Sequence, residues 1–162
     1  MTERENLQRL LYGEGAHANV LNALEGLDEK LVGMRPANSP HSIFQILWHI
    51  IYWQDYELAS IAGEHPSYPS HAVESWPQET TPKNLKEWEE TIQKFVAGLK
   101  HFEAMLADPA VDLDRVVDLK KNENMRDLIA MIIAHNSHHF GQIITLRQQL
   151  GSWPPPKGGD TW

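Results

Sequence analysis

The apolar pattern of residues 85–106 is the feature that most restricts the fold of this chain. Its apolar side chains recur at alternating intervals of three and four residues, which is the spacing of one helix face that packs in a bundle. The residues are Leu85, Trp88, Ile92, Phe95, Leu99, Phe102 and Leu106. The segment therefore predicts a long α-helix with one face in a helical core.

Two helical segments precede this one, and no segment indicates convincing strand pairing. The first covers about residues 3–32, and a break is predicted at Gly13–Gly15 because glycines weaken a helix interior. The second is expected to begin with Ser39 as the N-cap and Pro40 in the first turn, and to end at Gly63.

The third and fourth helices have boundary signals of their own. For the third, Thr81 is the expected N-cap, Pro82 the first helical residue, and Asp108-Pro109 the end. The fourth is expected to run from about Asn124 to Gly151, a residue type common just after a helix C-terminus.

Long connections separate the later helices. Residues 64–81 are rich in Pro, Ser and His and predict a crossover loop, and 109–123 predict a second link that is briefly extended at 114–119. Pro residues exclude a helix in the tail "GSWPPPKGGDTW", whose two tryptophans predict that it folds back onto the body. We expect one domain over residues 1–162, all-α, built as a four-helix bundle with long crossover connections.

Composition excludes several classes of protein. The formal net charge is −8, whereas nucleic acids and anionic membranes attract basic surfaces. No apolar run reaches the roughly 18–20 residues of a membrane span, and the N-terminus lacks the pattern of a signal peptide. We therefore expect a cytoplasmic protein without a nucleic-acid or membrane partner. Because the chain has no cysteine, any metal ligands must be His, Asp or Glu.

Three histidines fall within five positions of the fourth helix, in "IAHNSHHFGQI" at residues 133–143. An α-helix turns about 100° per residue. His139 then lies inside the apolar arc of the helix, and His135 lies at its shoulder one turn earlier. His138 is rotated toward the polar side. His135 and His139 are thus an inward pair at i and i+4, a spacing that can bring two imidazoles to one metal ion.

The second helix offers a third histidine, His49, on the side opposite its aliphatic residues. The same face includes Gln45, Tyr52, Trp53 and Tyr56. A histidine among aromatic and small polar groups is typical of a pocket wall or an interface. If this face meets the fourth helix, three histidines converge.

Three neutral histidines and a water form a catalytic type of site for Zn²⁺ or a similar divalent ion. Zn²⁺ and Ni²⁺ are the first candidates, with Fe, Co and Cu as alternatives. Simpler interpretations also exist for each part. His49 alone would be a hydrogen-bonded structural residue, the pair on the fourth helix would be surface decoration, and the aromatic residues would be core or dimer interface. His138 is expected to face solvent, or to contact one of the metal-binding residues without binding the ion itself.

Other groupings give weaker signals. Glu14 and His17 have the Glu-x-x-His spacing of di-iron bundles, but the motif occurs alone and beside two glycines. Ser137 points away from the inward pair, so it is a poor candidate for a nucleophile. The chain has no HExxH, GxSxG or P-loop motif.

Taken together, these features resemble the DinB/YfiT-like superfamily of bacterial four-helix bundles, which have a three-histidine metal site. The resemblance lies in "SPHSIFQILWHIIYW", in "HNSHHFGQIITLRQQLG", and in the order and length of the helices. The family pattern is one histidine in the middle of the second helix and His-x-x-x-His followed by Gly-Gln on the fourth. The matching residues here are His49, His135, His139, Gly141 and Gln142. Relatives often have a basic residue where this chain has Phe140, so substrate preference does not transfer.

The resemblance implies several functions. Characterised relatives include thiol-dependent enzymes that use mycothiol or bacillithiol, and others are described as metal-dependent hydrolases; the family also tends to dimerise. Our first hypothesis is a metal-dependent S-transferase that uses a low-molecular-weight thiol of the bacillithiol type. Because the chain has no cysteine, a cofactor must supply this thiol. In this reaction the ion lowers the pKa of the thiol, which attacks a small electrophile.

A hydrolase is the second hypothesis, and a non-enzymatic, homodimeric stress or metal-binding protein is the alternative from another class. No general base stands out, so Tyr, Asp and His side chains remain candidates for that role. The substrate pocket is expected to involve Gln45, Tyr52, Trp53, Tyr56 and Gln142.

Overall fold

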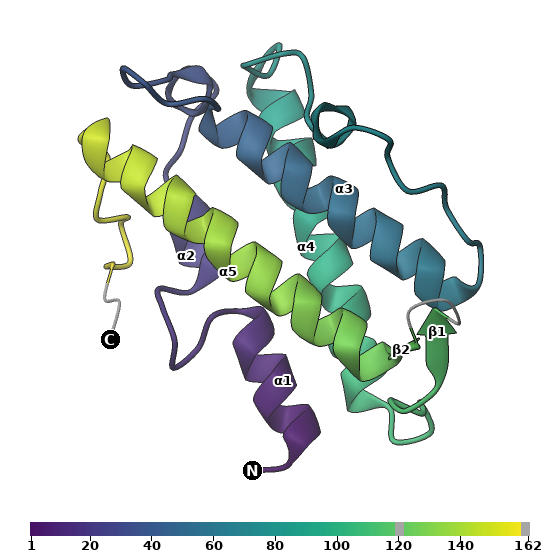
Figure 1. The fold of residues 1–162 in the computed structure, drawn as a ribbon. Coiled ribbons are helices and arrows are strands. Elements are labelled where there is room, and N and C mark those ends of the chain that lie inside the picture. Colours follow the sequence, from purple (N-terminus) through teal and green to yellow (C-terminus); the bar gives the residue numbers. More distant parts are fainter. Residues whose placement is uncertain (119–121, 160–162) are drawn as a thin grey trace.

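A computed structural model describes residues 1–118 and 122–159 of the protein. Four helices form a bundle, in which α3 packs against α4 and α5, and α1 packs against the same two helices (Figure 1). The bundle helices are α1 (Glu3–Leu11), α3 (Ile43–Ala62), α4 (Leu85–Ala107) and α5 (Met125–Gln149). The smaller elements are α2 (Val20–Leu24), the 3-10 turns η1 (Leu31–Gly33) and η2 (Ala72–Ser75), and the strands β1 (Val116–Asp118) and β2 (Glu123–Asn124). The predicted all-α class is confirmed.

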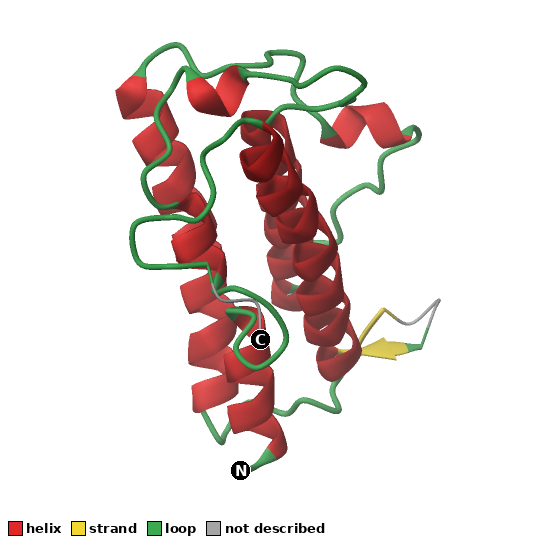
Figure 2. Ribbon diagram, turned by 90° about the vertical axis from the view of Figure 1, so that its left-hand side faces the viewer, coloured by secondary structure: helices red, strands yellow, loops and turns green. Residues whose placement is uncertain are grey.

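The connection between α3 and α4 sets the topology. Figure 1 shows that this connection runs back along α3, so that α3 and α4 point in the same direction while α5 points the opposite way. Figure 2 shows the bundle from the side, with several loops at its upper end and others along its side and at its lower end. The bundle is therefore not a simple up-down-up-down array, and the predicted crossover is present.

The core forms where the apolar stripes of the helices meet. Most of the predicted α4 stripe is buried, although Leu85 is 47% exposed at the start of the helix and Ile92 is half-buried. The largest buried apolar side chains are Trp88, Phe95, Phe102, Phe140, Leu11, Ile43, Leu47, Ile50, Ile51, Leu99 and Leu106. Phe140 contacts Phe95 with ring centroids 5.3 Å apart, so its apolar side chain serves the core.

The predicted break at Gly13–Gly15 is present, but the predicted helix over residues 3–32 is wrong in its extent. Helix α1 ends at Leu11, and only the short elements α2 and η1 follow before α3. Gly13 and Gly15 both have φ of +81°, a conformation that L side chains rarely adopt, so the chain turns here and does not continue as a helix. The helical spacing of leucines after this turn is not matched by a continuous helix.

Two predicted helix starts lie three residues too early. Helix α3 is capped by Ser42, not Ser39, and the Ser42 hydroxyl accepts from the backbone N–H of Gln45. Helix α4 is capped by Asn84, not Thr81, and the Asn84 amide oxygen accepts from Glu87 N–H. In both places the side chain that reaches the third N–H of the helix decides the start. The predicted start near Asn124 and the chain reversal at Gly151 agree with α5.

The remaining connections also differ in detail from the prediction. The extended stretch in 114–119 forms a small antiparallel pair, β1 with β2, which the sequence did not indicate; residue 119 lies outside the described residues. In the tail, Trp153 packs on the core as predicted, whereas Trp162 lies outside the described residues. None of the described helices is long and apolar enough to cross a membrane.

Candidate metal centre

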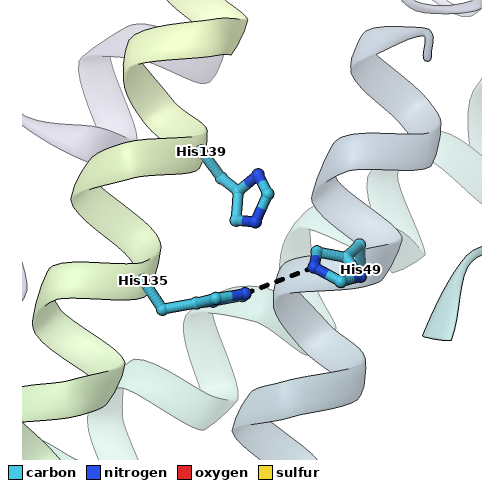
Figure 3. Close-up of side chains that lie close together, drawn as sticks. All are labelled: His49, His135 and His139. Atoms are coloured by element: carbon cyan, nitrogen blue, oxygen red, sulfur yellow. Dashed lines mark hydrogen bonds between the residues drawn. The ribbon is translucent and has the colours of Figure 1, made fainter. Parts of the chain in front are cut away.

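His49 of α3 and His135 and His139 of α5 point toward one another between the two helices (Figure 3). We call these three residues the histidine cluster. One ring nitrogen of each lies within 4.8 Å of the other two, and the Nε2 atoms of His49 and His135 are 3.2 Å apart. Two nitrogens that bind one tetrahedral ion at roughly 2.0–2.1 Å lie about 3.3 Å apart. The spacing of the cluster is therefore compatible with one divalent ion.

Hydrogen bonds from outside the cluster fix the protonation of two rings. Nδ1 of His49 lies 3.2 Å from the Ser75 carbonyl, and Nδ1 of His139 lies 2.8 Å from Oε1 of Gln142. Both oxygens can only accept, so each Nδ1 has the proton and each Nε2 has a free lone pair. Such outer partners orient metal-binding imidazoles in proteins. The Nε2 atoms of both rings are thereby prepared to bind an ion.

His135 is held differently from the other two histidines. Because Nε2 of His49 has no proton, Nε2 of His135 is the donor in the 3.2 Å contact between them. Nδ1 of His135 is buried and has no hydrogen-bond partner among the described residues. An ion bound at Nε2 of His135 would take the place of that proton, which the ring would then hold on Nδ1. The cluster thus fits an ion through all three Nε2 atoms.

Burial keeps the cluster neutral. It lowers the pKa of His49 and of His135 to about 4, and the nearby His139 lowers both values as a second cause. Burial also lowers the pKa of His139. All three rings are therefore uncharged at neutral pH, which is the form that binds metal ions.

These pKa shifts predict a pH-dependent stability of the metal-free protein. As the pH falls below about 6.5, the unfolded chain protonates its histidines, whereas His49 and His135 in the folded chain stay neutral until about pH 4. Stability from these groups is complete above pH 6.5 and is lost as the pH falls toward 4. Urea unfolding between pH 7.5 and 4.5 should show a weaker pH dependence in His135→Phe than in the parent. The exposed His101→Gln should keep the parent profile, and equal profiles for both variants would contradict the shift.

Gln142 is predicted to control metal affinity without touching the ion. Gln142→Leu removes the acceptor for Nδ1 of His139, so the ring loses its orientation and its fixed tautomer. Loss of an outer partner of this kind typically weakens metal binding about 10–100-fold. Competition with a chelating dye would measure this change. Gln148→Leu, on an exposed position of the same helix, is the matched control and should leave the affinity unchanged.

The crossover between α3 and α4 covers the cluster. Three polar side chains, the N-cap Ser42 and two residues of the first half of α3, donate to three carbonyls spread over residues 75–80 of this segment at 2.5, 3.1 and 3.2 Å. The pairs are Ser42 with Thr80, Gln45 with Pro77, and His49 with Ser75. Trp76 of the same segment lies between two imidazoles, with ring centroids 3.6 Å from His41 and 3.9 Å from His49. Docking of the crossover and orientation of His49 are therefore linked.

The predicted pocket residues separate into three locations. Tyr52, Trp53 and Tyr56 form a connected aromatic group, and Trp53 also lies 6.4 Å from the rings of both His49 and His135. Gln45 is buried and fastens the crossover, as described above. Gln142 lies beside His139, on the far side of the ring from the cluster.

The other residues singled out in the sequence have clear positions. His138 is exposed, and its Nε2 accepts from Gln142 at 3.2 Å, so it supports the cluster from outside. Ser137 faces away from the cluster and contacts Nε2 of His17 at 3.0 Å. His17 in turn donates from Nδ1 to the Ala18 carbonyl, which fixes the 12–19 turn against α5.

Sequence reasoning missed the contribution of the crossover. Ser75 and Trp76 contact His49, and Tyr68 extends the aromatic group by packing against Trp53 with ring centroids 5.4 Å apart. A tryptophan in a loop rich in Pro and Ser was the available signal, because a loop does not usually carry so large an apolar side chain unless it packs on the body.

A family of known proteins matches most of this chain. The sequence profile of the DinB superfamily matches residues 13–143, a range that includes the whole histidine cluster. No curated protein gives a significant match to the chain. Because the family match covers well over half of the sequence, the chain belongs to the DinB superfamily.

Proposed function

We propose that this protein is a metal-dependent enzyme whose divalent ion is held by His49, His135 and His139. The observation that carries the proposal is the composition of the cluster: among the described residues it contains three imidazoles and no carboxylate. A four-coordinate ion held by three protein ligands keeps one position for an external molecule, as in catalytic rather than structural sites. His138 does not belong to the group of histidines whose ring nitrogens converge, and its Nε2 instead accepts from Gln142.

The chain's own residues would prepare the site for this chemistry. Ser75 and Gln142 hold the Nδ1 protons of His49 and His139, so two lone pairs are oriented before any ion arrives. Trp53 and Trp76 flank the cluster and limit the access of water. A divalent ion bound here would lower the pKa of an external thiol or water toward neutrality.

Thiol-dependent S-transfer is the first candidate reaction. The chain has no cysteine, so a sulfur nucleophile must come from an external thiol, for which the resemblance to thiol-dependent relatives suggests the bacillithiol type. The thiolate would attack a small electrophile and displace its leaving group. The three-imidazole cluster supports this reaction because it leaves room on the ion for the thiol.

Hydrolysis is the second candidate reaction, and one observation favours it. The groove beside the cluster is lined by Glu74, Glu79 and Glu87, and among the described residues Lys83 is the one basic residue of its lining. These carboxylates repel a thiol that itself carries carboxylates, whereas they do not affect an uncharged water. Zn²⁺ sites with three protein ligands lower the pKa of a bound water, which can then act as the nucleophile in hydrolysis.

The experiment that tests the proposal combines metal analysis with two assays. Untagged protein is analysed by mass spectrometry for metal content, stripped with a chelator, and reloaded with Zn²⁺ or Ni²⁺. Transfer of bacillithiol to chlorodinitrobenzene and hydrolysis of nitrophenyl acetate are then compared for the stripped and reloaded forms. Metal-dependent turnover in either assay supports an enzyme and identifies the reaction.

Other outcomes would point to the rival from a different class. About one ion per chain without turnover in either assay would support a non-enzymatic metal-binding protein, and no uptake of any ion would contradict the metal centre itself. A homodimer stays a prediction, which light scattering of the same samples would check.

A further inference from the structure

A groove of about 410 Å³ lies beside the histidine cluster, between α3 and the crossover that leads into α4. One wall is an aromatic stripe of α3, formed by Phe44, Trp48 and Tyr52 at intervals of four residues. The opposite wall is the crossover itself, including Trp76 and Pro77. This volume is in the range of small-molecule sites, and the lining is mainly apolar, as such sites require.

The charged residues around the groove define the sign of its ligand. Glu74, Glu79 and Glu87 contribute three carboxylates, and Lys83 is the single ammonium of the lining. Glu87 accepts from the backbone N–H of Lys83 and lies 4.0 Å from its Nζ, and Glu74 accepts from the backbone N–H groups of Ser70 and His71. Glu79 is exposed, so its carboxylate is the one most accessible to a ligand. The potential in the groove is therefore negative, which attracts cations and repels anions.

The aromatic wall is suited to a cation as well. The face of an indole attracts an ammonium within about 6 Å of its centroid. The chain itself provides an example at this wall, because Nζ of Lys94 lies 5.3 Å from the centroid of the Trp48 ring. Aromatic rings and carboxylates together therefore offer both parts of a site for an organic ammonium.

We propose that this groove binds a small organic cation, an ammonium group attached to a flat apolar body. The apolar body lies against Tyr52, and the ammonium lies against the ring of Trp48 and near the carboxylate of Glu79. A carboxylate of the same shape loses both contributions and is repelled. This binding site is separate from the proposed chemistry, since it does not require an ion in the histidine cluster.

Isothermal titration of the chelator-treated full chain tests the proposal with two probes of similar shape. Phenethylammonium is expected to bind, with an affinity that falls as salt rises from about 0.05 to 0.5 M, and phenylpropionate is expected to show no binding. Glu79→Gln should weaken phenethylammonium binding about three- to fivefold, and Trp48→Leu about tenfold. Glu89→Gln removes an exposed carboxylate of α4 outside the groove and should change the affinity less than twofold.

Three results would contradict the binding of an organic cation in the groove. Equal affinity for the two probes, no binding of phenethylammonium, or an effect of Glu79→Gln no larger than that of Glu89→Gln would each overturn the proposal. Glu79 is exposed, so its variant is expected to fold even if Trp48→Leu does not. His135→Ala should still bind phenethylammonium, so that a failure of the metal centre and a failure of the groove are distinguished.

Discussion

Replacing His135 with Ala is expected to abolish stoichiometric metal binding and to weaken metal affinity by about a thousandfold or more. Structural zinc sites bind with about 10–16 kcal/mol shared among four ligands, so the loss of one ligand costs several kcal/mol. His135 is the cleanest position for this test, because its Nδ1 has no hydrogen-bond partner among the described residues. Its removal therefore leaves no outer partner of Nδ1 unpaired, although it does remove the ring contact with Trp53. Mass spectrometry for bound metal and titration with Zn²⁺ in a competing chelator would measure the effect.

The control for this prediction is His138→Ala on the same helix. His138 is exposed and reaches the cluster only through Gln142, so this variant should keep about one ion per chain. Thermal unfolding gives a second reading, since an ion that binds only the folded state raises the midpoint. Zn²⁺ should stabilise the parent and His138→Ala but not His135→Ala. Equal metal content in the two variants would contradict a site built on His135.

Replacing Arg147 with Met is expected to lower the free energy of unfolding by about 3–5 kcal/mol. The guanidinium is buried and donates to the carbonyls of Ala23, Glu25 and Ser152 at 2.7–3.1 Å. These bonds connect α5 to the end of α2 and to the tail. Methionine keeps much of the side-chain volume but leaves the carbonyls without a donor in a buried place. For a chain of this length the midpoint of thermal unfolding should fall by about 10 °C.

Arg126→Met provides the matched control. Arg126 lies at the start of the same helix, and its partners are carboxylates on more exposed side chains, Glu3 at 2.7 Å and Asp114 at 2.6 Å. Surface ion pairs of this kind contribute about 1 kcal/mol or less. Urea unfolding of both variants would compare the two environments. A loss at Arg147 no larger than at Arg126 would show that the buried guanidinium does not stabilise the α2 and tail contacts.

The predictions that held from sequence are those that depend on one helix at a time. The three- and four-residue spacing in residues 85–106 predicted α4, and the rotation of 100° per residue placed His139 inward and His138 outward on α5. The aliphatic stripe of α3 likewise placed His49 on the opposite side. Each of these inferences needs only the geometry of a helix, which the order of residue types expresses directly.

The predictions that failed concern helix ends, where two residues close together in the sequence could each begin or end the helix. Ser39 and Thr81 have the right chemistry for helix caps, but Ser42 and Asn84 are used because their side chains reach the third N–H of the helices that form. The leucine spacing before residue 32 favoured a helix that the positive φ of Gly13 and Gly15 interrupts. Local signals of similar strength occur within a few residues, and packing selects among them.

The order of residue types is enough to predict a helical bundle and to place three histidines on helix faces that are able to meet. The packing of the helices and the crossover was needed to show that Ser75 and Gln142 hold two of these rings, that Trp76 stacks on His49, and that an acidic groove adjoins them. The physical reason is the distance along the sequence between the residues that interact. A helix face is set by residues three and four positions apart, whereas the partners of His49 come from a segment more than twenty residues away, and no periodicity in the sequence connects the two.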